Sequence, residues 1–207
     1  MRFLVTGFAP FGNSSINPSY EAVCRLPDTL GEHRIYRAEL PVVYGQCGQI
    51  LCELIKRVQP DCVLCFGQAA GREGISLEST AVNVKASSSP DNDGVTFSGE
   101  PIVPDGPESL RARLPLRELC AELKDAGFHT KISFSAGTYV CNDLFYEMLH
   151  YAEESGSPKM CGFIHIPADE SQMADFAPGT PFMPIQQVVQ AAELMIEFLG
   201  KTVPGTF

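Results

Sequence analysis

Short apolar runs typical of buried strands alternate along this chain with segments whose apolar residues recur at helical spacing. The strand-like runs cover 1–7, 33–41, 60–67, 74–84, 130–135 and 159–167. The helix-like segments cover 18–26, 44–59, 114–128, 143–154 and 184–200. Strands separated by helices form mostly parallel sheets with helices on both faces. We therefore predict an α/β fold, a three-layer α/β/α sandwich around a mostly parallel twisted sheet.

Length and composition favour one soluble domain over residues 1–207. The net charge of −10 argues against nucleic acid or an anionic membrane surface as a partner. We expect no signal peptide and no membrane span, because no apolar run approaches about 18 residues. The eight cysteines are expected to be free thiols in a reducing cytoplasm, since a chain of this size needs no disulfide scaffold.

Cys141 lies in "SFSAGTYVCNDLFYEMLH", where a strand-like run gives way to a helix. The pattern places this thiol at a helix start, with Asn142 and Asp143 as residues of the type that cap helices. Backbone N–H groups at a helix N-terminus favour thiolate over thiol, and the thiolate is the nucleophile. The alternative is a buried structural cysteine. A base and an orienting partner would favour the reactive interpretation.

His165 and Glu78 are candidates for those two partners. His165 lies in "GFIHIP" at the carboxyl end of an apolar strand, where the parallel sheet would bring it to the same edge as Cys141. Taken alone, a histidine in such a place is more often a structural group with satisfied hydrogen bonds than a catalytic one. Glu78 follows "ISL" in a segment poor in charge, and a buried carboxylate needs a partner. That partner could be an imidazole or Arg72, and the sequence leaves both open.

Three further motifs surround these residues. "GFAPFG" has the glycine spacing of a phosphate loop but lacks its lysine, so Phe8 and Phe11 form either a pocket wall or part of the core. Gln68 ends a strand, where its amide could contact a substrate amide or only its own loop. Cys62 and Cys65 form a C-x-x-C within a strand. Residues three apart point to opposite faces there, so core packing is expected.

Six blocks of sequence together resemble the pyroglutamyl peptidase I family, also called pyrrolidone carboxyl peptidases. They are "VTGFAPFG" with "NPS", "GQAAGR", "ISLE" with "AVN", "PDN", "SAGTYVCN" and "GFIHIP". The resemblance implies a phosphorylase/hydrolase-like fold. It also implies a cytosolic homotetramer without a cofactor or metal, acting on N-terminally pyroglutamylated peptides.

The same resemblance assigns roles to individual residues. It makes Cys141 the nucleophile, His165 the general base and acid, and Glu78 the group that orients His165. Phe8 and Phe11 match aromatic residues that flank the pyrrolidone ring. Gln68 matches a residue that contacts the lactam. Asn17, in "NPS", matches a supporting position near the pocket.

The chain departs from the family pattern at three places. "ASSSPDN" has Ser88 where a basic residue is usual, "SFSAGTY" has Phe134 where Asn is usual, and Ala70 replaces a glycine. Two alternatives to an active peptidase stay open at this point. One is an inactive or weakly active homologue that binds pyroglutamyl peptides. The other is a nucleoside-type phosphorylase, which the lysine-poor loops disfavour. Whether residues 85–109, a Ser/Pro/Asp/Gly-rich loop, close over substrate is open as well.

Overall fold

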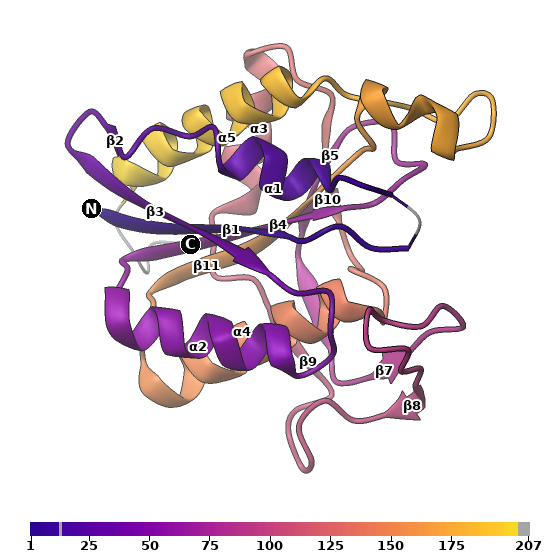
Figure 1. Ribbon diagram of the computed structural model, residues 1–207. Coiled ribbons are helices and arrows are strands. Elements are labelled where there is room, and N and C mark those ends of the chain that lie inside the picture. The colour runs from indigo at the N-terminus through magenta and orange to yellow at the C-terminus, as the bar shows by residue number, and fades with distance from the viewer. Residues whose placement is uncertain (13, 203–207) are drawn as a thin grey trace.

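The computed structural model describes residues 1–12 and 14–202, which form a central sheet with helices on both faces (Figure 1). The sheet has the strand order β10-β5-β11-β4-β1-β3-β2. Its strands are β1 (Arg2–Phe8), β2 (Thr29–Leu30), β3 (His33–Leu40), β4 (Cys62–Gln68), β5 (Ile75–Glu78), β10 (Thr130–Ser133) and β11 (Met160–Ile166). Four of the six strand pairings are parallel, which confirms the predicted α/β class.

Two layers of helices cover the sheet. One face carries α1 (Pro18–Val23), α3 (Leu116–Asp125) and α5 (Ile185–Gly200), and the other carries α2 (Gln46–Val58) and α4 (Val140–Ser155) (Figure 1). A short 3-10 helix, η1 (Glu170–Asp175), follows β11 and was not predicted from the sequence. None of the described helices combines the length and hydrophobicity needed to cross a membrane.

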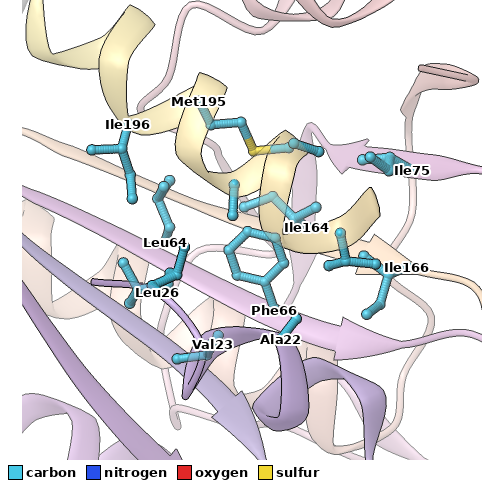
Figure 2. Close-up of a cluster of buried hydrophobic side chains, with 14 of the residues drawn as sticks. Ala22, Val23, Leu26, Leu64, Phe66, Ile75, Ile164, Ile166, Met195 and Ile196 are labelled. Atoms are coloured by element: carbon cyan, nitrogen blue, oxygen red, sulfur yellow. The ribbon is translucent and has the colours of Figure 1, made fainter. Parts of the chain in front are cut away.

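The alternation of side chains along the central strands divides the core into two parts. In β4, Cys62 packs with the cluster under α5, whereas Cys65 packs with the cluster over α2 and α4. This separation confirms that the C-x-x-C motif belongs to the core. Figure 2 shows the first cluster, in which Phe66 of β4 and Ile164 of β11 lie beneath Met195 of α5. Burial of both faces explains why these strands are almost continuously apolar in sequence.

The segment from 74 to 111 differs most from its sequence interpretation. The expected extended strand breaks after Glu78 into β5 and β6 (Thr80–Val82), and β6 pairs with β9 (Ser109–Arg111) outside the main sheet. The expected loop 85–109 also contains β7 (Lys85–Ala86) and β8 (Ser98–Glu100), which pair with each other. These strands are only two or three residues long, so they leave no periodic signal in the sequence.

The direction of β10 corrects one step of the sequence reasoning. β10 is parallel to β5, but β5 is antiparallel to β11, so the strand before Cys141 runs opposite to the strand that carries His165. The two residues therefore do not follow neighbouring parallel strands. Instead, residues 134–139 connect β10 to α4 and bring the start of α4 to the carboxyl end of β4. Periodicity in the sequence cannot distinguish an all-parallel sheet from this sheet, in which β5 and β10 run opposite to β11.

Candidate active site

A small cavity lies where the central parallel strands end. Phe8 is the last residue of β1 and Gln68 the last residue of β4, and both line this cavity. The other lining residues are Phe11, Asn17, Val42, Tyr139, Val140 and Cys141. Its empty space is about 270 Å³, near the lower limit of ordinary small-molecule pockets. All four residues assigned to substrate binding by resemblance thus lie around one cavity with Cys141.

Cys141 is the second residue of α4 and is half-buried. Its backbone N–H belongs to the first turn, where no carbonyl of the helix can accept a hydrogen bond. Its thiol lies against β4: a Cβ added to Gly67 would be 3.0 Å from the Cys141 Sγ. Gly67 is the direct partner of His165 in the parallel register, on the same face of the sheet. Glycine at 67 therefore leaves the space in which the thiol approaches the strand that bears His165.

His165 and Glu78 form a buried pair on neighbouring strands. The imidazole Nδ1 lies 2.7 Å from the Glu78 Oε1, and the two residues are 3% and 0% exposed. Arg72, from the β4–β5 connection, also binds the Glu78 Oε1, with its Nη1 at 2.5 Å. The sequence left an imidazole and Arg72 as alternative partners for Glu78, and the structure shows both at once. With Nδ1 donating to the carboxylate, Nε2 is left as the proton acceptor.

The electrostatics of this pair follow from burial and mutual contact. Burial acts to raise the pKa of Glu78, but the hydrogen bond from His165 and the charge of Arg72 outweigh it and hold this pKa below its usual value. Burial lowers the pKa of His165 despite the Glu78 carboxylate, and Arg72 adds to the lowering. At neutral pH the carboxylate is therefore charged and the imidazole is neutral, which is the state a general base requires.

The surroundings of Cys141 disfavour the thiolate that the sequence predicted from its position at a helix start. Burial raises the pKa of the Cys141 thiol to about 12, and the charge of Glu78 raises it further while Arg72 opposes the shift. The helix N-terminus is therefore outweighed by desolvation. A thiol in this state needs a base to accept its proton as it reacts.

Asn142 and Asp143 do not cap α4, contrary to the sequence interpretation. The N-cap residue is Tyr139, without a side-chain cap. The Asn142 amide instead binds the backbone of Val82 and Val84, with three contacts of 2.9 to 3.1 Å. The Asp143 carboxylate accepts a 2.7 Å hydrogen bond from the Gly45 N–H at the start of α2. Both side chains thus bind the first turn of α4, which carries Cys141, to neighbouring parts of the fold.

Amide networks hold the polar side of the cavity. The Gln68 Nε2 donates to the Gln172 Oε1 at 3.0 Å, and Gln172 in turn is only 2% exposed. Asn17 is the N-cap of α1 and accepts from the Ser19 N–H, while its own amide donates to the Ala9 carbonyl. These contacts fix the orientation of both side chains. Sequence reasoning missed Gln172, because η1 has no apolar periodicity.

The loop that carries the serine substitutions lies close to the cavity. The Tyr139 hydroxyl donates to the Pro90 carbonyl at 2.9 Å, and the Asn92 amide donates to the Pro10 carbonyl at 2.9 Å. The Asn92 N–H also binds the Val42 carbonyl. Three of the family blocks are thereby connected around the pocket. Val42 had no sequence signal as a lining residue, whereas Tyr139 and Val140 adjoin Cys141 in "SAGTYVCN".

The other three histidines and one of the departures from the family pattern lie outside this site. His129 is exposed, and His33 and His150 are half-buried at other places in the fold. Phe134, one of the departures from the family pattern, is 77% exposed after β10. Over residues 1–12 and 14–202, no three His, Cys, Asp or Glu side chains are grouped so that they could hold a metal ion. All eight cysteines are free.

Comparisons with known proteins agree with the geometry. The family model described as pyroglutamyl peptidase matches residues 1–201. A pyrrolidone-carboxylate peptidase of Thermococcus onnurineus is 40% identical over 95% of this chain and 98% of its own. A mutant pyrrolidone carboxyl peptidase from P. furiosus superimposes with a TM-score of 0.93 at 35% identity, over 98% of this chain and 100% of its own.

A second solved structure gives the same result. Pyroglutamyl peptidase I from Bacillus amyloliquefaciens superimposes with a TM-score of 0.92 at 34% identity, covering 97% of this chain and 95% of its own. The match extends over nearly the whole length in sequence and in structure. This chain belongs to the pyroglutamyl peptidase family.

Proposed function

We propose that the chain is a cysteine exopeptidase that removes N-terminal pyroglutamyl residues from peptides through a thioester intermediate. Cys141 is the nucleophile, His165 the general base and acid, and Glu78 the group that orients His165. The observation that carries this proposal is the shared location of these groups. Cys141 lines the apolar cavity, and its thiol lies beside Gly67, the register partner of the buried His165.

The cavity suits a neutral five-membered lactam. Phe8 and Phe11 provide flat apolar walls, and the Gln68 and Asn17 amides supply polar groups whose orientation is already fixed. A pyroglutamyl residue has no N-terminal ammonium, so its pocket needs no carboxylate to neutralise one. The cavity's lining residues include none. An ordinary amino-terminal residue would have to bury its charge here without a counter-ion, which is costly.

The reaction follows from the positions of the side chains. As the Cys141 Sγ attacks the carbonyl carbon that follows the lactam ring, its proton passes to the His165 Nε2. The Cys141 N–H, free at the start of α4, donates to the carbonyl oxygen as it becomes negative. Collapse of the tetrahedral intermediate breaks the C–N bond, and the imidazolium gives its proton to the leaving amine. Water then attacks the thioester, with His165 as base, and releases pyroglutamate.

Glu78 contributes by holding the imidazole and by stabilising its protonated form. Its carboxylate lies 2.7 Å from the imidazole Nδ1, so a positive charge on His165 is met by an existing negative one. The same contact keeps the ring in the orientation that presents Nε2 to the thiol. No cofactor or metal enters this scheme, and we propose a homotetramer acting in the cytoplasm by analogy with the family.

The test is release of a fluorescent amine from a pyroglutamyl amide by the purified, reduced protein. Prolyl and glutaminyl amides are the matched controls, since they differ in the lactam carbonyl or in ring closure. We expect release from the pyroglutamyl amide alone, abolished by Cys141→Ala with retention of fold. Tight binding of a pyroglutamyl aldehyde without any turnover would instead favour the inactive homologue and implicate the serine loop at 87–89.

A further inference from the structure

We propose that Arg72 is a positioning residue of the catalytic apparatus, which holds the Glu78 carboxylate ionised against His165 and ties this pair to the segment that leads to Cys141. The inference rests on the proposed function, because it assigns Arg72 a part in the same reaction. It goes beyond the three residues of the triad and concerns a side chain that does not line the cavity.

The geometry of Arg72 joins three parts of the fold. It lies in the connection between β4 and β5, and its Nη1 binds the Glu78 Oε1 at 2.5 Å. Its Nη2 donates to the Ser135 carbonyl at 3.3 Å, in the segment between β10 and α4. A planar guanidinium can hold two acceptors in a fixed relation, which a lysine cannot. Arg72 therefore relates the carboxylate to the segment that positions the nucleophile's helix.

Arg72 and His165 bind the same oxygen of Glu78, its Oε1. Glu78 is fully buried, and its neutral imidazole partner supplies a hydrogen bond but no counter-charge. An ionised carboxylate in such a place needs a cation, and Arg72 provides it. The Glu78 Oε2 has no hydrogen-bond partner within the described part of the chain, so the contacts at Oε1 hold the group.

The charge of Arg72 also acts on the two groups that exchange the proton. Glu78 from β5 and Arg72 from the β4–β5 connection act on His165, and the same two side chains act on Cys141 together with Cys65 of β4. Ser133 of β10 adds a hydroxyl beside the carboxylate. Arg72 lowers the pKa of His165 and of Cys141. Its loss would make the imidazole easier to protonate and the thiol harder to ionise.

The experiment compares Arg72→Met, which removes the charge, with Arg72→Lys, which keeps the charge but not the planar fork. Arg117→Met is the matched control, since Arg117 is an exposed cation on α3 in the opposite helical layer. With a pyroglutamyl amide as substrate, we expect Arg72→Met to lower kcat about 10- to 100-fold with little change in KM. For the same variant, the acid limb of the pH profile of kcat/KM should move to higher pH by about half a unit or more.

The lysine variant separates charge from geometry. Arg72→Lys should restore the position of the acid limb while kcat stays several-fold below the original, because the contact to Ser135 is lost. If Arg72→Met does not fold, this variant alone decides the question. An unchanged kcat in Arg72→Lys, or a loss of kcat in Arg72→Met with the acid limb unmoved, overturns the proposal.

A second readout needs no turnover. The rate of iodoacetamide alkylation at Cys141 is followed against pH by peptide mass spectrometry, with the exposed Cys24 as internal reference. Arg72→Met should shift the Cys141 alkylation profile to higher pH and leave the Cys24 profile unchanged. Arg117→Met should leave both profiles unchanged. Superimposable Cys141 profiles would refute the role of Arg72. A protein inactive on pyroglutamyl amides would defeat the proposed function but would leave this comparison intact.

Discussion

Replacement of Glu78 by glutamine removes one charge from the proposed site with almost no change of shape. In the unmodified protein the His165 Nδ1 lies 2.7 Å from the Glu78 Oε1. The amide oxygen of a glutamine at position 78 can still accept this hydrogen bond. What is lost is the negative charge that, in the proposed mechanism, stabilises the imidazolium after it has taken the thiol proton. The apolar walls of the cavity are untouched, so substrate affinity should change little.

The size of the effect follows from the contact that is weakened. A hydrogen bond to a charged group contributes roughly 1.5–3 kcal/mol, against about half that for a neutral one. The difference of roughly 0.75–1.5 kcal/mol, at about 1.4 kcal/mol per factor of ten, predicts that kcat should fall by about 3- to 10-fold. Since the carboxylate acts to raise the pKa of His165, its removal should also move the acid limb of kcat/KM to lower pH. This shift is opposite to the one expected for Arg72→Met.

The assay is a pH series of kcat and kcat/KM for a pyroglutamyl amide, with thermal unfolding as a control. Glu78→Gln leaves Arg72 without its ionic partner. The Arg72 side chain is 23% exposed and so stays partly hydrated, and we therefore expect the free energy of unfolding to fall by only about 1–3 kcal/mol. A rate unchanged across the pH range in a folded variant would refute the view that Glu78 acts through His165 and would make it a structural residue.

Three further perturbations test separate parts of the account. Gly67→Ala should lower kcat at least about tenfold, because its Cβ would lie 2.7 Å from the Phe163 ring and 3.0 Å from the Cys141 Sγ, so that both must shift; an unchanged rate would contradict the close approach. Phe11→Ala should raise KM about tenfold in a folded protein, and an unchanged KM would remove Phe11 from the lactam pocket. Burial and the charge of Asp143 raise the pKa of Glu147 from 4.5 to about 8, so its ionisation costs stability increasingly as the pH rises through this range. Glu147→Gln should therefore stabilise the fold by about 1–3 kcal/mol at pH 9 and little at pH 4, as measured by urea unfolding; an equal change at both pH values would be inconsistent with this reason.

The sequence predicted the elements of the sheet better than their order. Apolar runs and helical periodicity located β1, β4 and β11 and all five helices, because burial on both faces leaves a strong signal. The direction of β5 and β10 relative to β11 leaves none, since it depends on how connections cross the sheet. The pairings of β6 with β9 and of β7 with β8 were missed because these strands, of two or three residues each, are too short to leave a periodic pattern.

The candidate site shows a similar division between local and distant information. Cys141 at a helix start and His165 at a strand end could be predicted from the residues around them. The state of the thiol could not, because its pKa depends on burial by parts of the chain far from it in sequence. Gln172 and the contact between Arg72 and Ser135 were likewise beyond prediction, since they join segments through irregular connections.

If Cys141 is the nucleophile that we propose, it must carry the pyroglutamyl group during turnover. The protein is mixed with an activated pyroglutamyl ester and quenched in acid, and the acyl group is located by peptide mass spectrometry. We expect a pyroglutamyl thioester on the peptide that contains Cys141, formed within one turnover and absent from Cys141→Ala. Turnover of the ester without a thioester at Cys141, or with the acyl group on another cysteine, would contradict it.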